Sequence, residues 1–83
     1  MTVTKPLIIT QPHAGQLIRE LRLELGLTQE QFAAVLGVVY PTVNRWENGH
    51  AQPSPLALKQ VERMLQELGE QGQKILEKYF ERR

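Results

Sequence analysis

The residues of this chain that could ligate a metal ion are few and lie far apart. Its two histidines, His13 and His50, are distant in the sequence, and the chain contains no cysteine. A protein zinc site is built from several Cys, His or carboxylate ligands at close, regular spacing. The sequence therefore predicts no metal site and no cofactor.

Catalytic combinations of residues are equally hard to find. There is no Ser/His/Asp set, no pair of carboxylates suited to acid and base chemistry, and no glycine-rich phosphate loop. A chain of 83 residues also has little interior in which to bury a substrate. The sequence therefore predicts that the chain is not an enzyme.

Length and composition fit one small domain. A chain of this size buries only roughly 60% of its extended-chain surface, so its core is thin. Hydrophobic residues make up 41% of the chain, which is enough for a compact fold. The N-terminal sequence lacks the basic and apolar regions of a signal peptide, and no apolar run approaches the roughly 18 residues of a membrane span. We therefore expect a soluble, cytoplasmic protein.

Net charge gives weak guidance about partners. Proteins that bind nucleic acid usually present a basic surface, whereas this chain has a net charge of +1. Residues 14–68 sum to −1, from Arg19, Arg22, Arg45, Lys59 and Arg63 against Glu20, Glu24, Glu30, Glu47, Glu62 and Glu67. Non-specific attraction to phosphates should be weak, because it scales with the number of phosphates neutralised. The case for a partner must therefore rest on local pattern.

The elements that would position any binding side chain begin with two helices. Apolar residues at helical spacing predict a first helix from Ala14 that ends at Gly26, a residue free to adopt positive φ. Thr28 and Gln31 have the spacing of a capping box, so a second helix follows at once and ends at Gly37. The inward-facing residues are expected to be Ala14, Leu17, Ile18, Leu21 and Leu25 in the first helix, and Phe32, Ala33 and Leu36 in the second.

Proline positions locate two further helices. Pro41 is tolerated only in the first turn of a helix, so the third helix starts near residue 39 or 40 and runs to about 48. Ser54 followed by Pro55 is a helix cap followed by a first-turn proline, and predicts a fourth helix to about Leu68. Their inward-facing residues are expected to be Val43 and Trp46, then Leu58, Val61, Leu65 and Leu68.

The two ends of the chain are predicted to differ from this central part. Residues 1–13 form an N-terminal arm in which the run 7–10 is either mobile or a short strand. Gly69 and Gly72 are expected to bracket a break after the domain of residues 14–68. The last segment, 69–83, then contains an amphipathic helix with Ile75, Leu76, Tyr79 and Phe80 on one face.

The second and third helices have the features of a helix-turn-helix. This motif joins two short helices through a turn that often contains glycine, with small residues where the helices cross. Here Ala33 is expected at the crossing point, Gly37 in the turn, and Val43 in the angle between the helices. A bulky residue at the crossing point would force the helices apart.

The stretch LRLELGLTQEQFAAVLGVVYPTVNRWENG resembles the Cro/lambda-repressor-type (XRE-like) helix-turn-helix family. That family shows a Gly-Leu-Thr-Gln-Glu opening, an Ala-x-x-Leu-Gly-Val turn and a Trp-Glu-Asn-Gly close. The matching residues here are 26–30, 33–38 and 46–49. The resemblance continues through the fourth helix and implies an all-α, five-helix domain that binds double-stranded DNA.

The resemblance also implies which residues contact DNA. The third helix would lie in the major groove as a recognition helix, reading bases from its first turn and one turn later. Arg45 could bind guanine O6 and N7 in bidentate fashion, Asn44 could read adenine or hold a phosphate, and Val39 could touch a thymine methyl. Gln29 resembles the family's glutamine that grips a phosphate and braces the recognition helix. The full expected set is Thr28, Gln29, Val39, Tyr40, Pro41, Thr42, Asn44, Arg45, Asn48 and His50.

One segment departs from the family's pattern. The family often has Ser, Arg or Gln where this chain has Val39, Tyr40 and Pro41. Readout would then depend on Arg45, apolar contacts and DNA shape. The alternative is that this surface binds a protein, and that the chain is a protein-interaction module on a helix-turn-helix scaffold.

Three conspicuous residues are interpreted as structural. In the family, the positions of Arg22 and Glu47 form a partly buried ion pair between the first and third helices. Trp46 could stack on a ligand, but packing beneath the third helix is the preferred interpretation. Leu25 and Leu27 are expected in the core.

The C-terminal apolar stripe leaves the oligomeric state open. It either packs on the first and fourth helices or forms a homodimer interface. A dimer would bind a two-fold DNA site and gain affinity through effective concentration. The predicted function is a sequence-specific transcriptional regulator that acts by occupancy as a dimeric repressor. One form of this is an antitoxin that represses its own operon and holds a toxin.

Overall fold

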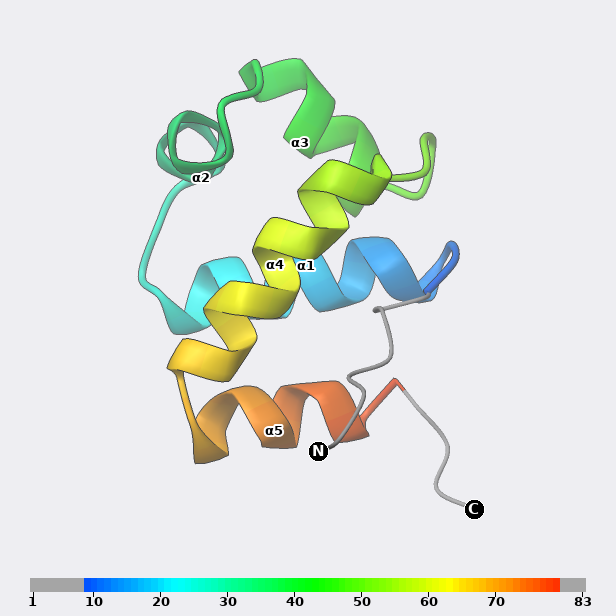
Figure 1. The fold of residues 1–83 in the computed structure, drawn as a ribbon. Coiled ribbons are helices and arrows are strands. Elements are labelled where there is room, and N and C mark those ends of the chain that lie inside the picture. The colour runs from blue at the N-terminus through cyan, green and yellow to red at the C-terminus, as the bar shows by residue number, and fades with distance from the viewer. Residues whose placement is uncertain (1–8, 80–83) are drawn as a thin grey trace.

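The computed structural model describes residues 9–79, which fold into five α-helices (Figure 1). These helices are α1 (His13–Glu24), α2 (Gln29–Leu36), α3 (Tyr40–Glu47), α4 (Pro55–Glu67) and α5 (Glu70–Glu77). Residues 9–79 contain no strand, and none of their helices is long and apolar enough to cross a membrane. The expected all-α, five-helix architecture is confirmed.

The start of α2 is the capping box that the sequence predicted. The Thr28 hydroxyl accepts a hydrogen bond from the Gln31 N–H at 3.1 Å, and the Gln31 side-chain oxygen accepts one from the Thr28 N–H at 2.9 Å. These two bonds satisfy two donors at a helix end that would otherwise have no partner within the helix. At the other end, Gly37 takes a φ of +74°, which turns the chain toward α3.

Removing the Thr28 hydroxyl should weaken this helix start. We expect Thr28→Ala to lower the free energy of unfolding by about 1 kcal/mol, because the Gln31 N–H loses its partner. Urea unfolding followed by circular dichroism measures the change. Thr28→Ser, which keeps the hydroxyl, is the matched control and should stay close to wild type. Equal stability of Thr28→Ala and wild type would contradict a stabilising role for the box.

The helices α3 and α4 also begin where the proline positions predicted. Val39 is the N-cap of α3 and Pro41 lies in its first turn. Ser54 caps α4 by accepting a hydrogen bond from the Ala57 N–H at 3.1 Å, and Pro55 is the first residue of the helix. A proline in a first turn costs no internal hydrogen bond, since the N–H there would have no helical partner.

The core lies between α1 and the four other helices. Phe32, Leu17 and Ile18 are among its fully buried side chains, and α2, α3 and α4 contribute the rest of its centre. Leu25 and Leu27 were expected in the core but are only half-buried, packed against its edge. The core residues are Ile9, Ala14, Leu17, Ile18, Leu21, Phe32, Ala33, Leu36, Val43, Trp46, Ala57, Leu58, Val61, Leu65 and Ile75.

The N-terminal segment differs from the predicted arm. Helix α1 begins at His13 and Ile9 is a buried core residue, so the described part of residues 1–13 packs on the domain. Ile9 and Thr10 form no strand, and the Ile9 carbonyl instead accepts a hydrogen bond from the Gln52 side chain at 2.8 Å. Residues 7 and 8 of the predicted strand lie outside the described residues.

The break before the last helix is shorter than predicted. Gly69, with a φ of +62°, separates α4 from α5, whereas Gly72 lies inside α5. Gly72 is buried against α4, and a Cβ at this position would collide with the Leu65 carbonyl. Its role is close packing of α5 on α4, so the expectation that it ends a break was wrong.

The apolar face of α5 is turned toward α4 and α1. Ile75 is buried, and Leu76 and Tyr79 pack partly buried against the core, while Phe80 lies outside the described residues. The Tyr79 hydroxyl donates to the Glu20 carboxylate of α1 at 2.9 Å. Burial and this hydrogen bond raise the pKa of Tyr79 to about 12. The end of α5 is therefore fastened to α1 by a polar contact as well as by packing.

Candidate nucleic-acid interface

The helices α2 and α3 are joined by a short turn and contact each other (Figure 1). Ala33 of α2 and Val43 of α3 are both buried, as expected for compact side chains between two packed helices. The turn between them is closed by backbone hydrogen bonds from Val38 to Ala33 at 2.9 Å and from Gly37 to Ala34 at 3.2 Å. This geometry fixes α3 at a set angle to α2.

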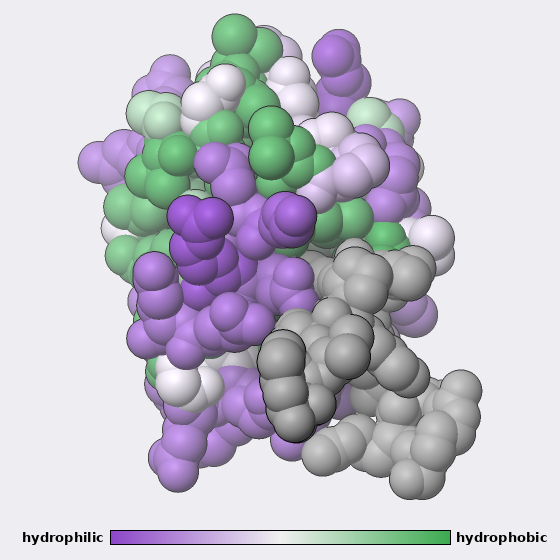
Figure 2. Space-filling view, viewed as in Figure 1, coloured by the Kyte–Doolittle hydropathy of each residue, from purple (hydrophilic) through white to green (hydrophobic). Residues whose placement is uncertain are grey.

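One side of α3 is anchored in the core and the other faces outward. Val43 and Trp46 point inward, with only 4% of Trp46 exposed, which confirms its expected role in packing. Val39 is 66% exposed and Tyr40 44%, and Pro41 and Arg45 are exposed as well. Figure 2 shows that apolar surface gathers where α2 and the start of α3 lie, while polar side chains cover much of α4.

A partly buried ion pair attaches α3 to α1. The Arg22 guanidinium contacts the Glu47 carboxylate through Nε at 2.7 Å and Nη2 at 3.0 Å. Only 12% of the Arg22 side chain and 3% of the Glu47 side chain are exposed. The hydrogen bond to Glu47 raises the pKa of Arg22 above its usual range. The pair that the resemblance implied is present, and its bidentate form sets the position of the C-terminal end of α3.

Three predicted site residues are joined to one another by hydrogen bonds. The Gln29 side chain donates to the Glu47 carboxylate at 2.9 Å and accepts from the Asn44 amide at 3.1 Å. Asn44 in turn accepts from the Asn48 side chain at 3.1 Å. The sequence suggested that each of these residues contacts DNA separately, whereas the fold joins them in one hydrogen-bonded network between α2 and α3.

Within residues 9–79, the other predicted site residues have no side-chain hydrogen bond to this network. Arg45 is exposed and projects from α3, and the half-buried Thr42 lies in its first turn. His50 is exposed after α3, with its N–H bonded to the Arg45 carbonyl at 2.9 Å. Thr28 uses its hydroxyl to cap α2. The first two N–H groups of α2, on Gln29 and Glu30, have no partner among residues 9–79.

Sequence reasoning missed the residue that holds the end of α3. The Gln11 side chain donates to the Trp46 carbonyl at 3.0 Å and to the Ala51 carbonyl at 2.6 Å, and accepts from the Gly15 N–H at 2.9 Å. It therefore links the segment before α1 to the chain that follows α3. No local pattern could have identified it, because its partners are 35 and 40 residues away.

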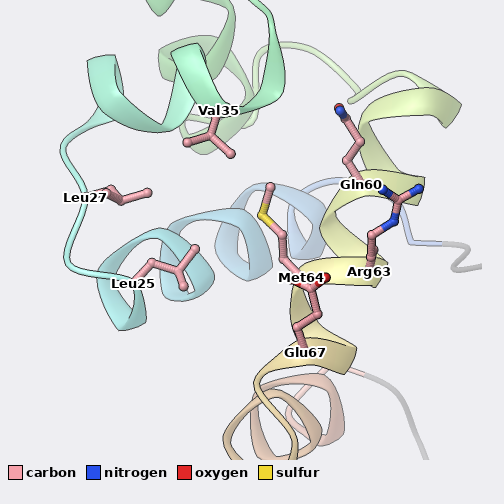
Figure 3. Close-up of a pocket in the computed structure, with 7 residues that line it drawn as sticks. All are labelled: Leu25, Leu27, Val35, Gln60, Arg63, Met64 and Glu67. Carbon is pink, nitrogen blue, oxygen red and sulfur yellow. The ribbon is translucent and has the colours of Figure 1, made fainter.

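A hollow in the described part of the chain lies on a different surface. It has a volume of about 480 Å³ and lies between α4, α2 and the end of α1 (Figure 3). Apolar side chains line one wall and mostly polar ones from α4 the other, and none belongs to the predicted DNA-contacting set. Residues 9–79 hold no group of three His or Glu that could bind a metal ion. The lining residues are Leu25, Leu27, Val35, Gln60, Arg63, Met64 and Glu67.

An α3 that is anchored on one side and exposed on the other, held across α2, defines a helix-turn-helix domain of the kind that binds double-stranded DNA in transcription regulators. The comparison with known families agrees. Residues 18–70 match a helix-turn-helix family model (HTH_3), and the chain belongs to that family.

Two relatives carry the same region. The chain is 44% identical over 57 residues to a propionyl-CoA carboxylase regulator of Cereibacter sphaeroides, a match that covers 69% of this chain and 12% of the relative. It is 45% identical over 49 residues to an uncharacterized HTH-type transcriptional regulator of Methanothermobacter thermautotrophicus, which covers 59% of this chain and 71% of the relative. No solved structure matches the chain significantly.

Proposed function

We propose that this chain is a transcriptional repressor that binds, as a homodimer, a two-fold operator in double-stranded DNA. Repression would occur by occupancy, since the bound dimer excludes other proteins from the operator. An antitoxin that controls its own operon is one form of such a repressor. A cytoplasmic location is part of this proposal, and no catalytic role is assigned.

The observation that carries the proposal is the rigid mounting of α3. Val43 and Trp46 anchor it in the core, the Arg22–Glu47 pair attaches its last turn to α1, and Gln11 holds the carbonyl at its end. A helix that reads base edges must keep its side chains in fixed positions, because each contact depends on geometry within hydrogen-bond distance. The outward side of α3 remains free for such contacts.

Arg45 is the principal base-reading residue in this proposal. It is exposed, projects from α3, and has the planar donor group that matches guanine O6 and N7. Val39, Tyr40 and Pro41 form an apolar first turn beside it, suited to contact with thymine methyl groups and to recognition of DNA shape. The N–H groups of Gln29 and Glu30 at the start of α2 would donate hydrogen bonds to a phosphate.

Dimerisation compensates for the small number of positive charges. Residues 14–68 have a net charge of −1, so one protomer gains little from phosphate neutralisation. Two protomers joined in one body would bind two half-sites one helical turn apart and gain affinity through effective concentration. Regulator relatives in two organisms support the assignment to transcription control.

A protein-interaction role is the alternative, and the apolar exposed first turn of α3 favours it. Val39 and Tyr40 are large hydrophobic residues that are exposed on the surface. The two functions make different demands on Arg45. Sequence-specific DNA binding requires its guanidinium, whereas an apolar protein contact through Val39 and Tyr40 does not.

Arg45→Ala should weaken binding to the selected sequence. We expect a pool of random duplexes at about 100 mM salt to yield a two-fold motif with the wild type, and an affinity loss of about tenfold to a hundredfold for that motif with Arg45→Ala. Binding of the selected duplex by fluorescence anisotropy measures the loss.

Arg63→Ala is the charge-matched control, because it removes an exposed arginine from α4, away from α3. It should leave the selected motif unchanged. Failure of the wild type to enrich any sequence would refute the repressor proposal and favour the protein-interaction alternative. An equal loss in both variants would show that Arg45 acts only through its charge.

A further inference from the structure

Five polar side chains run in a continuous line from the interior to the surface of this domain. The line begins at the partly buried Arg22–Glu47 pair, continues through Gln29 and Asn44, and ends at the exposed Asn48. Its three outer hydrogen bonds measure 2.9, 3.1 and 3.1 Å. One hydrogen-bonded network thus connects α1, α2, α3 and the C-cap of α3.

The line has a direction that is imposed by its buried end. An ionised carboxylate can only accept hydrogen bonds, so Gln29 must turn its NH₂ group toward Glu47 and its oxygen toward Asn44. Asn44 must then present its NH₂ group to Gln29 and its oxygen to Asn48. Rotating the Asn44 amide by half a turn would set donor against donor and acceptor against acceptor at its two neighbours.

We propose that Gln29, itself oriented by Glu47, fixes the orientation of the Asn44 amide and so determines which base Asn44 selects. This inference rests on the proposed function and extends it. Gln29 is a positioning residue in this view, separate from any contact it makes with phosphate.

The selectivity follows from what the fixed amide still offers. Asn44 keeps one N–H and one oxygen lone pair, since each polar atom is engaged once within the protein. Adenine presents an acceptor at N7 and a donor at N6, whereas guanine presents two acceptors. An amide with donor and acceptor in fixed places matches the adenine pattern. An amide that rotates freely loses part of this discrimination and must also be ordered on binding.

The first test uses the free protein. In nitrogen-15 spectra, the side-chain NH₂ of Asn44 should exchange slowly with solvent in the wild type. Gln29→Met keeps the length of the side chain but cannot hydrogen-bond, and should shift the Asn44 signal and bring its exchange to that of an exposed asparagine. Gln16→Met, on the exposed side of α1, is the control and should leave the signal unchanged. An unchanged Asn44 signal in Gln29→Met would overturn the inference.

The second test measures base preference on the selected duplex. With every position varied in turn, Gln29→Met should reduce discrimination by roughly threefold or more at a single base pair per half-site. That base pair should be the one at which Asn44→Ala also loses preference. Adding Gln29→Met to Asn44→Ala should then change nothing further at that position. Preserved discrimination there, or an equal loss of affinity for all sequences, would overturn the positioning role and leave Gln29 as a phosphate contact only.

The two tests separate this inference from the proposed function. Failure of the wild type to bind any specific duplex would refute the repressor proposal, while the spectra of the free protein would still decide whether Gln29 orients Asn44. Circular dichroism of each variant is measured as well, to test whether a changed Asn44 signal comes from unfolding.

Discussion

Replacement of Arg22 by methionine should lower the free energy of unfolding by about 3–5 kcal/mol, the largest change we expect from any single substitution outside the apolar core. The Glu47 side chain is only 3% exposed, so removing the guanidinium leaves a poorly solvated carboxylate without its ion-pair partner. The Gln29 amide is then its one remaining partner from the ion-pair network. Native domains have total stabilities of roughly 5–15 kcal/mol, so this variant should be largely unfolded at moderate urea concentrations.

A double substitution separates the buried charge from the lost packing. Arg22→Met combined with Glu47→Leu removes both charges and should recover much of the stability, because paired burial of charge is often no better than apolar packing. Lys78→Met is the surface control, since the Lys78–Glu20 pair is exposed on the lysine side and should matter little. Urea unfolding of all three variants gives the comparison. A loss for Arg22→Met no larger than that for Lys78→Met would show that the pair does not hold α1 and α3 together.

The helices and their ends were predictable because the signals that set them are local. The capping box of Thr28 and Gln31, the first-turn prolines at 41 and 55, and the positive φ of Gly37 each act within about one helical turn. The apolar stripes identified the buried faces, because residues three or four positions apart lie on the same face of a helix. The Arg22–Glu47 pair was foreseen from the family resemblance, because residues 25 positions apart give no local signal of contact.

Contacts between distant segments could not be predicted in the same way. Gln11 and the two carbonyls that it binds, those of Trp46 and Ala51, are brought together only when α1 packs against the end of α3. Gly72 is a residue type that often interrupts helices, yet here it allows α5 to pack closely on α4. Only the packed structure reveals this contact. The Gln29–Asn44 bond depends on the angle between α2 and α3, so the site residues could be named without knowing that they bind one another.

Gly15→Ala should destabilise the domain by about 1–3 kcal/mol, although alanine is the better helix former by roughly 1 kcal/mol. Gly15 is buried in α1, and a Cβ built on it would collide with the Trp46 carbonyl at the end of α3. The obstacle is backbone, which cannot move aside as a flexible side chain would. The same Cβ would come within 3.1 Å of the Gln11 oxygen that accepts the Gly15 N–H. The substitution therefore forces α1 and α3 apart and disturbs the Gln11 hydrogen bonds that connect them.

The expected signature of Gly15→Ala has two parts. Thermal unfolding should occur at a lower temperature than in the wild type, and the altered position of α3 should weaken binding to the selected duplex by more than the stability loss alone explains. Gln16→Ala, one residue further along α1 and exposed, is the control and should be neutral or slightly stabilising. A stabilised Gly15→Ala would mean that α1 and α3 can separate without cost, and that the position of the recognition helix does not depend on this close approach.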